Sequence, residues 1–169
     1  MSKLSIVMPV LDEGEGIAAT LDALADLRAL GTEVIVVDGG SRDATIQRAR
    51  PRADRVILAP RGRALQMNAG ARCEEGRGAD VLLFLHADVR LPREADRLIF
   101  RALSNSHACW GRFDVGLEGR SPGLGLVGAL MNLRSRATGI CTGDQARSEE
   151  RRVGKECQSV CRSRWSPYH

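Results

Sequence analysis

Residues 4–10 read LSIVMPV, a short apolar stretch with the length of one buried strand. Three similar stretches follow it along the chain: EVIVV at 33–37, RVILA at 55–59 and VLLFL at 81–85. The segments between them predict helices over 17–30, from Asp43 (capped by Ser41) to Pro51, over 64–73 and over 93–103. Strands that alternate with helices indicate an α/β fold with a mostly parallel sheet flanked by helices, in which the very apolar 81–85 lies centrally.

The pattern changes after Ser104. Residues 109–117 predict a strand, and 123–136 predict a Gly-rich amphipathic helix. The apolar face of this helix packs in the core or makes peripheral contact with a membrane surface; both interpretations stay open. We find no internal repeat and no linker, so residues 1–146 are expected to form one domain.

Composition excludes several classes of protein. With 43% hydrophobic residues in a chain of 169, the sequence is too apolar for intrinsic disorder. No apolar run reaches the roughly 20 residues that a membrane-spanning helix needs, and residues 1–10 do not resemble a signal peptide. Five cysteines without metal-ligand spacing indicate reduced thiols, so we expect a cytoplasmic protein, with the inner face of the membrane as a further location.

Residues 147–169 differ in composition from the rest of the chain. They read RSEERRVGKECQSVCRSRWSPYH and resemble a translated sequencing adapter; a genuine basic tail is the alternative. They have no apolar periodicity, so we expect them to be non-native, disordered and dispensable. They carry six Lys or Arg but three Asp or Glu, and without them the net charge of +4 falls to near neutral. The charge argument for nucleic-acid binding is then lost.

Charged residues gather where the predicted strands end. In an open parallel sheet, ligands bind outside the carboxyl ends of the strands. Segments 9–13, 38–41 and 86–88 contribute acids, and 60–63 contributes Arg61 and Arg63. Acids beside arginines suit a ligand that has hydroxyls, phosphates and a divalent cation.

Residues 14–19 read GEGIAA, which matches the GxGxxA pattern of dinucleotide sites, with Asp38 about twenty residues later. Two features disfavour such a site. Three residues separate the strand from Gly14, and the carboxylates of Asp12, Glu13 and Glu15 would surround the pyrophosphate. We interpret the segment as a turn leading into a helix.

Four segments occur in a characteristic order: PVLDEG (9–14), VVDGGSRDAT (36–45), GRALQMNAGA (62–71) and FLHADVRLP (84–92). Together they resemble family 2 glycosyltransferases, which have the GT-A fold. VDGGSRDAT, the HAD triplet and TGDQA (142–146) are more narrowly similar to a bacterial subgroup of arsenosugar-type or radical-SAM-associated transferases.

The resemblance implies a site for a nucleotide-diphosphate sugar donor. It assigns Pro9, Leu11, Glu13 and Asp38 to the nucleoside, with an Asx turn at the strand end as the alternative role for Asp38. It places Arg63 at the nucleotide and diphosphate. Asp43 fits better as a first-turn acid of its helix than as a ligand.

The triplet His86-Ala87-Asp88 occupies the position of the family's DxD motif. Asp88 matches the acid that binds a divalent metal, Mn²⁺ or Mg²⁺, which neutralises the leaving diphosphate. His86 stands where the common form has an aspartate at the ribose. Imidazole can bind a hydroxyl or Mn²⁺, so His86 is retained as a site residue.

By resemblance, the chain is a metal-dependent, inverting glycosyltransferase that acts on an unknown acceptor. We expect its general base beyond Ala146, which makes these 169 residues a truncated form without useful transfer activity. A nucleotidyltransferase and a non-catalytic nucleotide-binding fragment are the alternatives. The first would want a Gly-, Arg- or Lys-rich loop after the first strand, where PVLDEG offers none.

Overall fold

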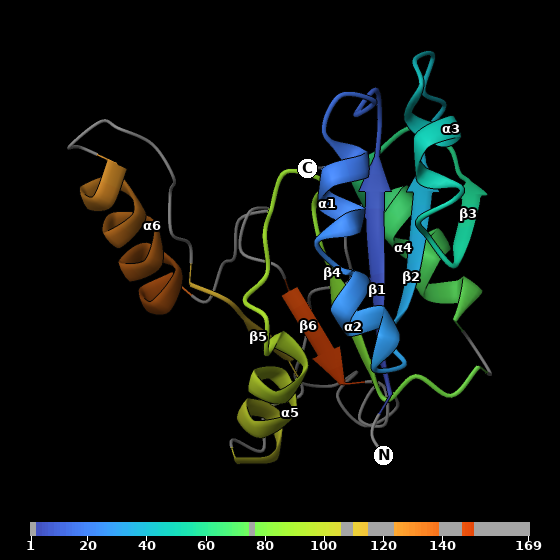
Figure 1. Ribbon diagram of the computed structural model, residues 1–169. Helices are drawn as coiled ribbons and strands as arrows, with labels where there is room; N and C mark the ends of the chain where they lie inside the picture. The colour runs from blue at the N-terminus through green and yellow to red at the C-terminus, as the bar shows by residue number, and fades with distance from the viewer. Residues whose placement is uncertain (1–2, 75–76, 106–109, 115–123, 139–146, 151–169) are drawn as a thin grey trace.

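The computed structural model describes residues 3–74, 77–105, 110–114, 124–138 and 147–150. Its elements, drawn in Figure 1, are β1 (Leu4–Val10), α1 (Ile17–Asp22), α2 (Ala25–Ala29), β2 (Glu33–Asp38), α3 (Thr45–Ala49), β3 (Arg55–Leu58), α4 (Arg63–Cys73), β4 (Val81–Phe84), α5 (Ala95–Asn105), β5 (Trp110–Arg112), α6 (Leu124–Thr138) and β6 (Arg147–Glu150).

The strands form a six-stranded sheet in the order β3-β2-β1-β4-β6-β5. The first four are parallel, and in register Val7 lies opposite Ile35 on one side and Phe84 on the other. This confirms the predicted α/β class and the central place of β4. Parallel pairing also brings the carboxyl ends of β1, β2 and β4 to one edge, where the candidate site lies.

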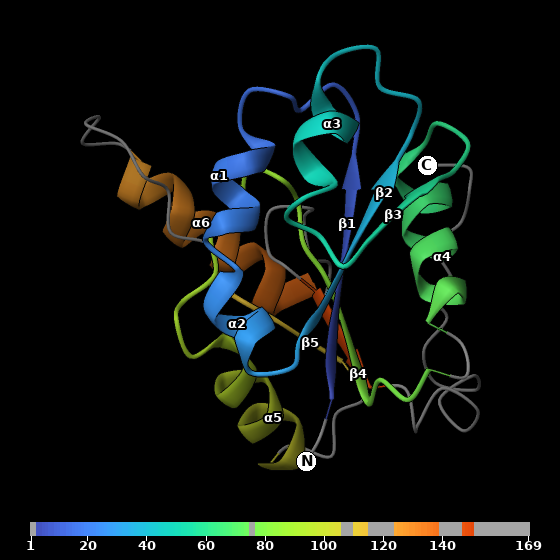
Figure 2. The ribbon, with the colours of Figure 1, turned by 45° about the vertical axis from the view of Figure 1, so that its right-hand side comes forward.

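Alternating residues of each strand serve two separate cores. On β1, Leu4, Ile6, Met8 and Val10 pack under α1, α2, α3 and α5, whereas Val7 faces α4. Figure 2 shows α1, α2 and α3 on one side of the sheet and α4 on the other. Strands β1, β2 and β4 are buried on both faces, which explains why their sequences are apolar runs, whereas the edge strand β3 is half-buried.

Helix α4 approaches the sheet closely because it carries a glycine at the contact. A Cβ atom at Gly70 would lie 2.3 Å from Cγ1 of Val7 and 3.0 Å from Cγ2 of Val37. Only hydrogen fits between the helix backbone and these two buried valines. This contact fixes the distance of α4 from β1 and β2, and with it the position of its first turn.

The helix predicted over 17–30 is two helices, α1 and α2, with the break at Leu24. Apolar residues three apart would rotate around a regular helix of 3.6 residues per turn. A tighter turn, in which the N–H of Leu24 donates to the carbonyl of Leu21 (3.1 Å), keeps Leu21, Leu24 and Leu27 on the sheet. Of the predicted strand 109–117, the structure describes residues 110–114, and only Trp110–Arg112 form a strand, β5; residues 109 and 115–117 lie outside the described ranges.

The predicted Ser41 cap is wrong. Helix α3 begins later, at Thr45, and its N-cap Ala44 makes no side-chain capping bond. The Ser41 hydroxyl instead donates to Asp38 and accepts from the N–H of Asp12 (2.9 Å). The prediction of Asp43 as a first-turn acid is also wrong, because Asp43 precedes the N-cap Ala44 and the first turn of α3 holds no acid. Asp43 acts from outside the helix, where it accepts from the N–H of Thr45 (2.9 Å).

The expectation that residues 147–169 are disordered is wrong for their first four residues. Arg147–Glu150 form β6, which pairs antiparallel with β4 on one side and β5 on the other. Backbone bonds make this ladder, so it needs no apolar periodicity, and without β6 the edge of the buried strand β4 would be open. Residues 151–169 lie outside the described ranges.

Helix α6 stands away from the sheet in Figure 1. Val127, Leu130 and Leu133 are 47%, 55% and 64% exposed, so core packing does not account for this face among the described residues. None of the described helices is long and apolar enough to cross a membrane.

Candidate functional site

A pocket of about 320 Å³ opens at the carboxyl edge of the sheet. Its wall comes from the end of β1 and the loop after it, from the start of α4 and the two residues before it, and from the loop after β4. The lining residues are Pro9, Val10, Leu11, Glu13, Arg61, Gly62, Arg63, Gln66 and His86. Five of the six residues predicted for nucleotide-sugar binding are therefore brought together: Pro9, Leu11, Glu13, Arg63 and His86.

Asp38, the sixth, is not in the pocket wall. It is fully buried, and its Oδ2 accepts from the N–H groups of Gly40 (2.8 Å) and Ser41 (2.9 Å), while Oδ1 accepts from the Ser41 hydroxyl. This is the Asx-turn role that the sequence left as the alternative. The Asp38 carboxylate thus organises the loop after β2, and its assignment to the nucleoside stays a prediction.

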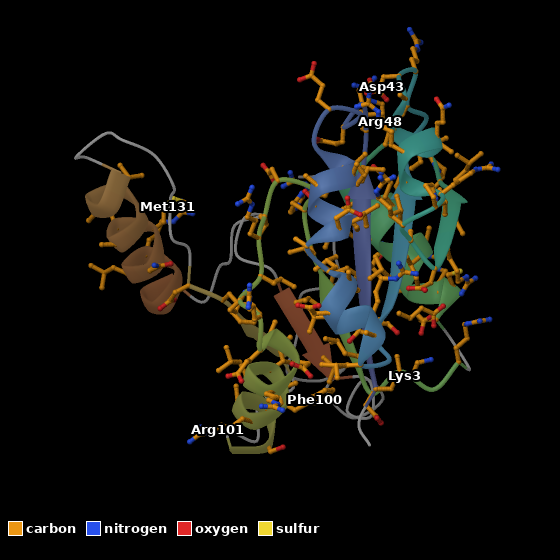
Figure 3. The ribbon with its side chains drawn as sticks, viewed as in Figure 1. Lys3, Asp43, Arg48, Phe100, Arg101 and Met131 are labelled. Carbon is orange, nitrogen blue, oxygen red and sulfur yellow. The ribbon has the colours of Figure 1, made fainter. Side chains whose placement is uncertain are left out.

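The loop after β1 is held by the loop after β2. The N–H groups of Asp12, Glu13 and Gly14 donate to the side chains of Ser41 (2.9 Å), Thr45 (2.8 Å) and Asp43 (2.8 Å). Arg48 donates to the Gly14 carbonyl from the other side, and Figure 3 shows Asp43 and Arg48 together at this end of the molecule. These bonds fix Leu11 and Glu13 at the pocket.

The same bonds rule against a dinucleotide site at 14–19. Pyrophosphate sites at glycine-rich turns need free backbone N–H groups. Here the N–H groups of residues 12–14 are taken by side chains, and those of Gly16 and Ile17 donate to the Glu13 carbonyl. This agrees with the interpretation of the segment as a turn.

We call the bonds between the loop after β1 and the side chains of Ser41, Asp43 and Thr45 the clamp, and Asp43 is its most strongly bonded acid. Hydrogen bonds from Thr45, through its hydroxyl first and then its N–H, and from the Gly14 N–H lower the pKa of Asp43. Bonds to the charged form favour that form. The clamp is therefore complete only when Asp43 is ionised.

Two arginines and a helix start make one wall of the pocket electropositive. Arg61 and Arg63 are exposed and flank Gly62, whose φ of +141° lets the chain turn into α4. The first N–H groups of any helix lack helical partners, and they carry partial positive charge. This wall suits phosphate oxygens.

His86 and Asp88 occupy different places. His86 is half-buried and lines the pocket, whereas Asp88 is exposed and lies outside the lining residues. The Thr20 hydroxyl donates to the carbonyl of Ala87, and the N–H of Val89 donates to the carbonyl of His86 (3.2 Å), so the loop is anchored on both sides.

The described residues fit a shared metal site better than a complete one. They contain no cluster of three or more His, Cys, Asp or Glu side chains that could hold a metal ion. Mg²⁺-type sites commonly use one or two carboxylates together with phosphate oxygens of the substrate. The exposed carboxylate of Asp88 is compatible with that arrangement.

Gln66 is a lining residue that the sequence analysis missed. Its Nε2 donates to the carbonyls of Val10 and Val37, both at 2.8 Å, and ties the end of β1 to that of β2. A glutamine in a helix carries no sequence signal for this role. Its position one turn after Arg63 could have suggested it.

The fold agrees with solved glycosyltransferase structures. The chain is 21% identical to the mannosyltransferase PcManGT from Pyrobaculum calidifontis, solved with GDP-Man and Mn²⁺, with a TM-score of 0.64 over 92% of this chain and 46% of that one. Glucosyl-3-phosphoglycerate synthase from Mycobacterium tuberculosis, solved with Mn²⁺, UDP and phosphoglyceric acid, is 23% identical, with a TM-score of 0.61 over 90% of this chain and 57% of that one. S. aureus TarS, solved with UDP, is 21% identical, with a TM-score of 0.57 over 70% of this chain and 37% of that one.

The chain thus spans about half the length of these structures. No curated protein matches it significantly. The likeness confirms the predicted GT-A fold. The family model for glycosyl transferase family 2 matches residues 5–139, which is most of the chain, and the protein therefore belongs to that family.

Proposed function

We propose that this chain binds a nucleotide-diphosphate sugar and serves as the donor-binding part of a metal-dependent glycosyltransferase. The observation that carries the proposal is the pocket, where apolar strand ends, two arginines and a histidine meet in about 320 Å³. Such a wall offers a flat apolar surface for a nucleoside and a cationic surface for a diphosphate. Both are needed to hold a sugar donor.

Each part of the donor has a matching part of the wall. Pro9 and Leu11 supply the apolar surface for the base, and Glu13 can accept hydrogen bonds from ribose hydroxyls. Arg61, Arg63 and the first turn of α4 face the diphosphate. Asp38 supports the pocket indirectly: it accepts a hydrogen bond from the Ser41 hydroxyl, and Ser41 accepts one from the Asp12 N–H in the loop after β1.

A divalent cation, Mn²⁺ or Mg²⁺, would be held by Asp88 together with the donor's phosphate oxygens. His86 would face the donor from the pocket wall. When bound, such an ion neutralises charge that develops on the leaving diphosphate. Asp88 is exposed, and the bond across its loop joins the backbone of Val89 and His86 and leaves the Asp88 carboxylate out, so a carboxylate oxygen is available as a ligand.

The relatives support the ligand class. PcManGT was solved with GDP-Man and Mn²⁺, and the mycobacterial synthase with UDP and Mn²⁺. For this chain the donor sugar, an inverting outcome, the acceptor and membership of the arsenosugar-type or radical-SAM-associated subgroup stay predictions. Contact with a membrane surface through α6 is a further proposal, supported by the exposed Val127, Leu130 and Leu133.

Calorimetry with Mn²⁺ and either UDP or GDP tests the proposal. Arg63→Ala should weaken the binding of the preferred nucleotide about tenfold, because a charge-assisted hydrogen bond contributes roughly 1.5–3 kcal/mol and this side chain is exposed. Arg72→Ala, an exposed arginine in the last turn of the same helix, is the matched control and should leave affinity unchanged. Equal losses in the two variants, or no binding of either nucleotide, would refute it.

A further inference from the structure

The orientation of the Gln66 carboxamide is forced by its neighbours. The side chain is 4% exposed, and one end of the amide lies 2.8 Å from two backbone carbonyls, those of Val10 and Val37. Carbonyl oxygens only accept hydrogen bonds, so the NH₂ group must face them and both of its hydrogens are used. Oε1 consequently points away from the two strand ends' carbonyls.

No described residue donates a hydrogen bond to Oε1 of Gln66; the bonds of this side chain are the two made by Nε2. Oε1 of Gln66 is not among the fully buried side-chain atoms without a hydrogen-bond partner, so it reaches the accessible surface. Gln66 belongs to the pocket wall, and its NH₂ group is already satisfied. Oε1 is therefore the atom through which Gln66 can serve a ligand.

Gly39 makes room for this oxygen. A Cβ atom at Gly39 would lie only 2.9 Å from Oε1 and 3.0 Å from Cδ of Gln66. The N–H of Gly39 donates to the Val10 carbonyl (3.0 Å), which is also an acceptor for Gln66, so both residues share one anchor. The oxygen is held beside Gly39, the residue that follows β2.

The position of Oε1 selects one part of the donor. Phosphate oxygens are acceptors and would be repelled by another acceptor, so the diphosphate belongs with Arg61 and Arg63, one turn earlier. The groups of a nucleotide that donate are its hydroxyls and the N–H groups of its base. The deep wall near Pro9 and Val10 is apolar, which favours the flat base.

We infer that Oε1 of Gln66 accepts a hydrogen bond from the ring N–H of the donor's nucleobase, N3–H of uracil or N1–H of guanine. This inference rests on the proposed function and adds a specificity-determining residue to it. Gln66 then links base recognition to the strand ends, because the same amide joins β1, β2 and the ligand.

A double-mutant cycle with methylated nucleotides tests the inference. The affinities of UDP and N3-methyl-UDP, or of GDP and N1-methyl-GDP if GDP binds more tightly, are measured with Mn²⁺ for the unaltered chain and for Gln66→Met. Methylation should weaken binding to the unaltered chain, and this penalty should shrink about two- to tenfold in Gln66→Met, the range for one neutral hydrogen bond. Gln47→Met, at an exposed glutamine of α3, should leave the penalty unchanged.

The outcomes separate this inference from the proposed function. If the nucleotide binds but the methylation penalty is the same in Gln66→Met, the inference is wrong and the proposed function stands. A Gln66-dependent penalty for 2′-deoxy-UDP in place of the methylated base would overturn it in favour of a ribose contact. If Gln66→Met does not fold, Gly39→Ala replaces it, since its Cβ would displace Oε1 and should reduce the same penalty.

Discussion

Gly70→Ala adds a single methyl group at the closest contact between α4 and the sheet. The new Cβ would lie 2.3 Å from Cγ1 and 3.2 Å from Cγ2 of Val7, and 3.0 Å from Cγ2 of Val37. Val7 is fully buried on β1, which is paired on both sides, so it cannot move away from the helix. Either α4 shifts outward or the valines leave their rotamers.

We expect Gly70→Ala to lower the free energy of unfolding by about 2 kcal/mol. Overpacking of this kind costs about 1–3 kcal/mol, and the central position of Val7 favours the upper end. Replacing glycine by alanine inside a helix returns about 1 kcal/mol. For a domain of this size, a net loss of about 2 kcal/mol lowers the melting temperature by about 4–8 °C.

Urea unfolding followed by circular dichroism measures this change. Gly16→Ala is the matched control, because Gly16 has no atom near its Cβ position and a negative φ (−99°), and it should change stability by no more than about 0.5 kcal/mol. In a Val7→Ala background, which removes both Cγ atoms of Val7, the penalty of Gly70→Ala should shrink, and only the contact with Cγ2 of Val37 (3.0 Å) remains. A penalty of undiminished size there would refute the steric explanation.

Three further predictions concern charge and pairing. Ionised Asp43 accepts hydrogen bonds from Thr45 and Gly14, which lower its pKa, so its contribution to stability is present above the ordinary pKa of 3.8 and is lost as pH falls through the lower folded value. Asp43→Asn should therefore lower the free energy of unfolding at pH 7 and make the acid side of the stability–pH curve less steep. Arg55→Met should lower the free energy of chemical unfolding by about 1–3 kcal/mol, because the guanidinium of Arg55 neutralises the charge of the fully buried Glu74, with 3.6 Å from Nη1 to Oε1. The control Arg97→Met breaks the exposed ion pair with Glu94 and should cost less than about 1 kcal/mol. Deleting residues 147–169 should destabilise the chain and expose the edge of β4 to hydrogen exchange; an unchanged melting temperature would show that β6 contributes nothing.

The parallel part of the fold could be predicted because its signal is local and strong. Strands β1, β2 and β4 are apolar runs buried on both faces, whereas the edge strand β3 is half-buried and ends at the exposed Leu58. Turns or helices separate the four strands. The break at Leu24 could not be predicted with equal ease, since a spacing of three is compatible with both a regular and a tightened helix. Strand β6 has no apolar signal at all and depends on the edge that β4 offers.

The site could be predicted where a charged or apolar residue lies at the end of a strand or within three residues after it. Pro9, Leu11, Glu13 and His86 are of this kind, and Arg63 starts the helix that helps to line the same pocket. Asp38 looked the same in sequence, but its side chain turned back to the loop, because the N–H groups of Gly40 and Ser41 lay within reach. The place of Gln66 one turn after Arg63 could have suggested that it lines the pocket, but its hydrogen bonds could not be predicted, because they go to two carbonyls distant in sequence.

The most direct test of the donor-site proposal is a crystal structure of the chain with UDP or GDP and Mn²⁺. We predict the diphosphate between Arg63 and the end of β1, the base near Pro9, and an anomalous Mn²⁺ peak bonded to Asp88 and to phosphate oxygen. A nucleotide bound elsewhere on the molecule, or a Mn²⁺ ion that shares no ligand with the diphosphate, would contradict the proposal.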